Sequence, residues 1–212
     1  MNNRLNTYPF LKYLYSALLI MLSVSVASSQ NYLSVNAGIL YSDYDIDEQG
    51  YESINISTGS GFFFGGEYLN IPENGKTPGI KISAFYSQRG ATVENNGVLH
   101  DSQFNAIDFD LLSHIYIKAR RSFVYLDLGP GFSVLTKKDV TDLLVDEDSN
   151  PLQMNSTLLS VVAGLGYDRV IGSNIVGIFM RFKFALTNLY SEYASPSNQF
   201  DIGLTYRLPM GR

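Results

Sequence analysis

Aspartates alternate with other residues through the segment 43–48 (DYDIDE), a spacing that suits oxygen ligation of calcium. An EF-hand loop starting at Asp43 needs Gly at its sixth position and Glu at its twelfth. The chain has Glu48 and Ile54 there, so the EF-hand interpretation fails. More acids follow between residues 135 and 158, and acidic loops could bridge to lipopolysaccharide through divalent cations. A solvated, mutually repelling surface is the simpler interpretation, and we assign no metal ligands.

The residue types of a hydrolytic triad are consecutive at His100, Asp101 and Ser102. Neighbours in a chain seldom form a triad, because its roles depend on side chains that converge in space. His114 is expected to be a hydrogen-bonded filler of the interior rather than a catalytic base. The Gly-Leu-Gly segment 164–166 continues into a strand pattern, not a helix, so it is no phosphate-binding loop. We therefore predict no catalytic residue, no cofactor and no enzymatic activity.

Composition narrows the class of protein. The 212 residues include no Cys, which excludes disulfide scaffolds, thiolate metal sites and thiol catalysis. The net charge of −5 argues against nucleic acid as a partner, because phosphate binding needs a basic surface. Only 17% of the residues are charged, against about 25% in an ordinary soluble domain.

Residues 1–29 have the pattern of a secretory signal peptide. Arg4 and Lys12 make a basic start, a mostly apolar stretch follows over 13–26, and small residues come just before Gln30. The apolar stretch is too short to cross a bilayer as a helix, and no later segment is apolar for long enough. We expect a mature domain over 30–212 that is either a soluble exported protein or an outer-membrane β-barrel.

After the leader the dominant hydrophobic period is two, which is typical of strands. Eight segments of about the length that a tilted transmembrane strand needs show this alternation. They span 33–41, 61–69, 80–89, 107–118, 123–134, 159–168, 176–187 and 200–208. The predicted fold is all-β: an eight-stranded antiparallel up-and-down transmembrane β-barrel.

One face of each strand is apolar, and the other holds the charges and nearly all the strand glycines. Small residues suit the concave side of a narrow barrel, where they make room for aromatic rings such as Phe63 and Phe179, so the charged face should be the lumen. Equal numbers of acids and bases on this face predict a filled, salt-bridged interior rather than a pore. These residues are Glu67, Asp108, Asp110, Asp127, Asp168, Asp201, Lys81, Arg89, Lys118, Arg181, Lys183 and Arg207. The alternative is a soluble, lipocalin-like barrel with its apolar face inward.

The connections between the predicted strands alternate in length. The links at 70–79, 119–122 and 169–175 are short, whereas those at 42–60, 90–106, 135–158 and 188–199 are long. Short turns on the periplasmic rim, long loops outside and an aromatic girdle near each rim are typical of outer-membrane barrels. Pro130 lies on the lipid face of a central strand and cannot donate a ladder hydrogen bond, which predicts a β-bulge there.

Several segments resemble the PorT-like outer-membrane β-barrel family. They are FYSQRG at 85–90, LGPG at 128–131, LTN at 186–188 and the closing strand DIGLTYR at 201–207. The resemblance covers most of the mature chain and implies an eight-stranded outer-membrane barrel with a link to protein secretion. The C-terminus departs from the pattern, because Pro209 to Arg212 follow Leu208 where a terminal aromatic residue is common.

Together these features predict a non-enzymatic protein of a Gram-negative-type outer membrane, exported by a cleaved signal peptide, with a structural or protein-interaction role. The expected partners are outer-membrane lipid and lipopolysaccharide, and other envelope or secretion proteins. Fold alone does not establish a function. A lipid-modifying enzyme that uses His100 and Ser102, a small channel and a soluble lipocalin-like binding barrel stay open as alternatives.

Overall fold

The computed structural model describes residues 29–44, 54–57, 59–72, 77–95, 98–139, 155–189 and 197–210. These residues form nine strands of one sheet: β1 (Ser29–Tyr44), β2 (Ile54–Ser57), β3 (Gly59–Pro72), β4 (Gly79–Asn95), β5 (Val98–Ala119), β6 (Ser122–Asp139), β7 (Thr157–Ile171), β8 (Asn174–Ala185) and β9 (Ser197–Met210). The predicted leader lies outside the described residues, apart from Ser29. None of the described residues forms a helix long and apolar enough to cross a membrane.

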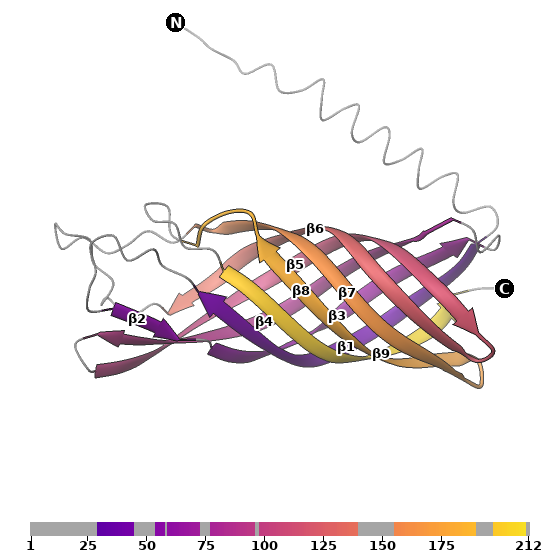
Figure 1. Cartoon of the computed structure of the whole chain (residues 1–212), viewed down its shortest axis with the longest axis horizontal. Coiled ribbons are helices and arrows are strands. Elements are labelled where there is room, and N and C mark those ends of the chain that lie inside the picture. The colour runs from indigo at the N-terminus through magenta and orange to yellow at the C-terminus, as the bar shows by residue number, and fades with distance from the viewer. Residues whose placement is uncertain are drawn as a thin grey trace, which may run out of the picture.

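Eight of the strands close into a barrel (Figure 1). Each of β3 to β8 pairs antiparallel with the next strand along the chain, β1 pairs with β3, and the β1–β9 ladder from Asn31–Met210 to Tyr44–Ser197 closes the ring. The predicted eight-stranded up-and-down barrel is confirmed. Most of the strands are longer than their alternating segments.

The outer end of the barrel differs from the prediction at two expected loops. The ladder of β4 and β5 continues to Asn95–Val98, so most of the expected loop 90–106 is a hairpin. β2, within the expected loop 42–60, pairs with Thr92–Asn95 of β4 and lies at one end of the molecule (Figure 1). Where both faces of a strand contact water, apolar and polar residues no longer alternate along it. The hydrophobic alternation from which the strands were predicted is therefore lost there. Residues 45–48 of the acidic segment 43–48 lie outside the described residues, and so does most of the acidic segment 135–158.

The opposite end carries tight turns. Arg120 and Arg121 join β5 to β6, and Gly172 and Ser173 join β7 to β8. Arg120 has a φ of 56° and Gly172 a φ of 65°, both in the left-handed region that two-residue hairpin turns use. The short links expected near 119–122 and 169–175 are therefore confirmed.

Apolar side chains face outward and charged ones inward, as the positions of the strand glycines predict. Along β5 the ring of Phe109 is 46% exposed, whereas its neighbours Asp108 and Asp110 are at most 2% exposed. β8 repeats the pattern, with Ile178 exposed beside the buried Arg181. Aqueous solvent does not explain an outer wall of this kind, but a bilayer does.

Glycines inside the barrel make room for aromatic rings. A Cβ atom on Gly38 would lie 2.1 Å from the carbonyl oxygen of Ile202 and 2.7 Å from the ring of Phe63. A Cβ atom on Gly166 would lie 2.2 Å from the ring of Tyr125. Gly66 faces outward and has no such neighbour closer than 3.7 Å. The preference of glycine for the lumen is therefore a packing requirement of a narrow barrel.

The expected bulge at Pro130 is wrong. Pro130 is exposed on the outer wall, but Asp110 still pairs with Gly131 and Ser113 with Leu128, so both strands skip two residues and the register is unchanged. The register of β5 and β6 shifts at Asn105–Ala106 instead. There the extra residue of β6, Thr136, donates its hydroxyl hydrogen to the Asn105 carbonyl at 3.3 Å.

Candidate functional site

The lumen holds two clusters of paired charges. In the first, Arg181 reaches Asp110 at 2.8 Å and Asp201 at 2.5 Å, and Lys183 lies 3.0 Å from Asp110. Arg89 pairs with Asp108, which also accepts hydrogen bonds from the hydroxyls of two serines, Ser87 and Ser133. Strands β4, β5, β6, β8 and β9 all contribute, so the cluster ties opposite walls of the barrel together.

The second cluster lies toward the periplasmic end. Lys81 reaches Asp127 at 2.6 Å and Glu67 at 3.6 Å, and Nδ1 of His114 lies 2.7 Å from the other oxygen of Asp127. Arg207 joins Glu67 at 3.2 Å to Asp168 at 3.4 Å. His114 is thus a hydrogen-bonded interior residue.

Aromatic rings fill the space beside these charges. Phe63 packs edge-on against Phe85 and at 5.8 Å against Phe179. The guanidinium of Arg181 lies 4.4 Å from the centre of the Phe85 ring, and the Lys81 ammonium lies 4.5 Å from that of Tyr125. Cations over ring faces are stabilised by the ring quadrupole, so the aromatic groups serve both packing and charge. Aromatic rings and paired charges therefore fill the lumen beside these two clusters.

Eleven of the twelve predicted lumenal charges are buried, and Lys118 is the exception. It is exposed one residue before the end of β5, with its ammonium 5.7 Å from the centre of the Phe123 ring. Alternation assigns a side chain to a face of the sheet, but it does not say how far along the barrel the chain lies. Lys118 lies near the end of the barrel, where solvent reaches its side chain.

A cavity of about 260 Å³ lies in the mouth of the barrel at the end with the tight turns, the rim that the sequence predicts to be periplasmic. Strands β1, β3, β5 and β6 supply its lining residues, which are Gln30, Tyr32, Ile71, Pro72, Tyr116, Lys118 and Phe123. Ile71 and Phe123 pack on a buried apolar cluster of Tyr32, Leu69 and Ile175, which closes the barrel beneath the cavity. Single-strand patterns could not reveal this site, because it forms where four strands meet.

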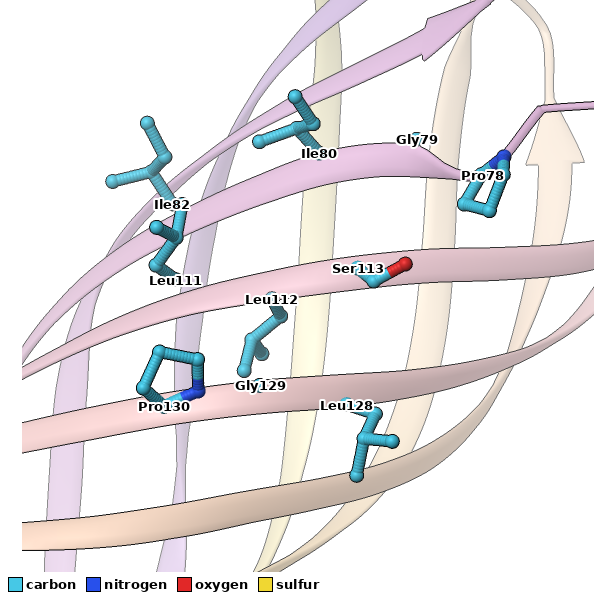
Figure 2. Close-up of a pocket in the computed structure, with 10 residues that line it drawn as sticks. All are labelled: Pro78, Gly79, Ile80, Ile82, Leu111, Leu112, Ser113, Leu128, Gly129 and Pro130. Carbon is cyan, nitrogen blue, oxygen red and sulfur yellow. The ribbon is translucent and has the colours of Figure 1, made fainter. Parts of the chain in front are cut away.

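A second hollow, of about 350 Å³, lies on the membrane-facing wall over β4, β5 and β6 (Figure 2). It coincides with the interrupted pairing of Leu111 and Leu112 with Gly129 and Pro130. Because Pro130 has no N–H group, the ladder cannot be completed there. The lining is almost entirely apolar, as expected of a surface in contact with lipid tails.

The triad-like residues do not form a described site. His100, Asp101 and Ser102 belong to the backbone ladder of β5, opposite Val93, Thr92 and Ala91, rather than to a loop. The described residues contain no group of three metal-ligating side chains close enough to hold an ion.

Residues 28–191 match the family model described as outer membrane protein beta-barrel domain. This match covers more than half of the chain. The chain belongs to the outer membrane protein beta-barrel domain family. Membership places the protein in the outer membrane of a Gram-negative bacterium.

Solved structures agree on the fold of this outer-membrane barrel. Outer membrane protein OprG from Pseudomonas aeruginosa matches with a TM-score of 0.56 at 12% identity, over 85% of this chain and 97% of OprG. Outer membrane protein AlkL, solved by solid-state NMR in lipid bilayers, matches with a TM-score of 0.50 at 12% identity, over 87% of this chain and 92% of AlkL. Identities this low show a shared fold alone. No curated protein matches the sequence.

Proposed function

We propose that this outer-membrane barrel is a non-enzymatic, non-conducting protein with a structural or protein-interaction role in the envelope, of the PorT-like kind and linked to protein secretion. The observation that supports a closed barrel is the packing of the lumen. Asp108, Asp201 and Arg207 are each no more than 1% exposed, so water has almost no access to the charges at the centre. An ion pathway would need hydrated space at these side chains.

Planar-bilayer recording of the purified full chain tests this proposal. We expect no steady conductance, with a porin in the same bilayer as the positive control. Steady, reproducible channels from the folded protein would contradict the proposal and favour the small-channel alternative.

The enzyme alternative has a separate test. If His100 and Ser102 modified lipid A, a His100→Ala variant would alter the lipid profile of the cells. We expect the profiles of His100→Ala and wild-type cells to be the same, because these residues are part of a strand ladder. A lost modification, restored by the wild-type gene, would establish an enzyme.

The proposed partners follow from the two surfaces of the barrel. The exposed apolar wall suits outer-membrane lipid. The hairpin of β4 and β5 with β2 extends at one end of the molecule (Figure 1), where it could contact lipopolysaccharide and neighbouring envelope proteins. Cleavage of the predicted leader before Gln30 is checked by N-terminal sequencing of the mature protein.

A further inference from the structure

The periplasmic mouth combines one cation, aromatic walls and an apolar floor in a single cavity. Lys118 supplies the charge, the rings of Tyr116 and Phe123 lie 6.0 Å apart, and Ile71 belongs to the floor. Tyr32 donates its hydroxyl hydrogen to Gln30 at 2.9 Å, which fixes the polar edge. The volume of about 260 Å³ leaves room for one large side chain.

Charge at this end of the barrel is unbalanced. Arg120, Arg121 and Arg169 are exposed at the periplasmic turns around Lys118. No carboxylate among the described residues lies within salt-bridge distance of these four cations. The nearby acids of the lumen, Glu67, Asp127 and Asp168, are buried and paired with Lys81 and Arg207. Among the described residues of this rim, the exposed charges are therefore positive.

The cavity opens to water rather than to lipid. On β5 the side chains of Ile115 and Ile117 face outward and are 48% and 73% exposed, whereas Tyr116 and Lys118, on the other face, line the mouth. A lipid tail on the outer wall meets the isoleucines, but it does not reach a cavity inside the ring of strands. A polypeptide in the periplasm can reach this cavity.

We propose that the periplasmic mouth binds the C-terminal segment of an acidic peptide, a site that deepens the proposed interaction role and rests on it. The terminal carboxylate pairs with Lys118, and an apolar or aromatic last side chain lies between Phe123 and Ile71. Acidic residues before it pair with Arg120, Arg121 and Arg169. Capture of a terminal carboxylate together with a side-chain pocket is a recurring mode of peptide recognition.

The absence of Trp from the chain provides a clean assay. The probe is the peptide Glu-Asp-Leu-Trp with a free C-terminal carboxylate, titrated with the full chain in discs of zwitterionic phospholipid, so that all tryptophan emission comes from the peptide. We expect a saturable blue shift, which weakens at higher salt. Amidation of the peptide terminus should weaken binding about tenfold, the effect of losing one well-placed charged hydrogen bond.

Variants of the chain separate this site from general attraction. Lys118→Gln should weaken binding about tenfold, and Lys118→Arg should retain most of it. Lys138→Gln removes the same charge near the outer end of β6 and should leave binding unchanged. Each variant is first shown to have the gel mobility of the folded barrel.

Several results would overturn the proposal. The first is a lack of saturable binding, and the second is an equal loss of binding in Lys118→Gln and Lys138→Gln. The third is loss of wild-type binding when anionic phospholipid is added to the disc, which would show that the rim binds lipid. The readout is independent of conductance, so a conducting barrel that binds the peptide would refute only the non-conducting part of the proposed function. A silent barrel that does not bind it would refute this site alone.

Discussion

At the scale of single residues, lumenal glycine is a steric requirement that can be tested by one methyl group. Gly38→Ala would place Cβ 2.1 Å from the carbonyl oxygen of Ile202. The β1–β9 ladder holds both strands in place, so neither backbone can easily move away. We expect a loss of about 1–3 kcal/mol, the usual cost of overpacking. Urea unfolding in lipid vesicles measures it. Gly66→Ala is the matched control on the outer face, and an equal loss there would contradict the packing argument.

The buried ion pairs make a second prediction at this scale. Lys81→Met leaves Asp127 and Glu67 without their shared cation in a dry interior, which should cost about 3–5 kcal/mol. Adding Asp127→Leu to the same chain removes the carboxylate that has lost the Lys81 ammonium and should recover part of the loss. The free energy of unfolding of the single and double variants gives the coupling. If Lys81→Met had the stability of the wild type, the pair would not contribute as described.

The face of each residue could be predicted from sequence, but its depth and its partners could not. Alternation placed the charges on one face of each strand, and the glycines on that face identified it as the lumen, which is correct for eleven charges. The prediction that Lys118 is buried in the lumen was wrong, because this residue lies near the end of the barrel. The pairing of Lys81 with Asp127 joins strands far apart in sequence, and no pattern within one strand encodes it.

At the scale of elements, the β5–β6 turn stores a small strain at Arg120, which has a φ of 56°. Asn tolerates this left-handed conformation better than Arg does. Arg120→Asn should therefore stabilise the barrel by about 0.5–1 kcal/mol. Arg121→Asn, at the next position of the turn, is the control and should bring no gain. The urea midpoint checks both variants, and a loss in Arg120→Asn would contradict the strain.

The extension of β4 and β5 beyond Arg89 could not be predicted from alternation either. The alternation ends near Arg89, yet β4 and β5 remain paired to Asn95 and Val98, because backbone hydrogen bonds continue where no lipid selects apolar side chains. The same limit applies to the bulge, which depends on two strands together. Pro130 interrupts one ladder without changing its register, whereas Thr136 carries the extra residue.

At the scale of the whole molecule, the central claim is that the apolar face meets lipid and the paired charges are enclosed. The chain has no Cys, so single cysteines can be placed along β8 without any background. Spin labels at 178, 180 and 182, which replace exposed apolar residues, should be relaxed by oxygen dissolved in the bilayer. Labels at 116 and 118 of β5, on the lumenal face where the cavity leaves room for them, should be shielded from this oxygen.

Power-saturation measurements across these five positions, in vesicles of the folded full chain, test the claim most directly. The account predicts high oxygen accessibility at the three positions of β8 and low accessibility at 116 and 118 of β5. The reverse order, or an equal response at all five positions, would contradict it.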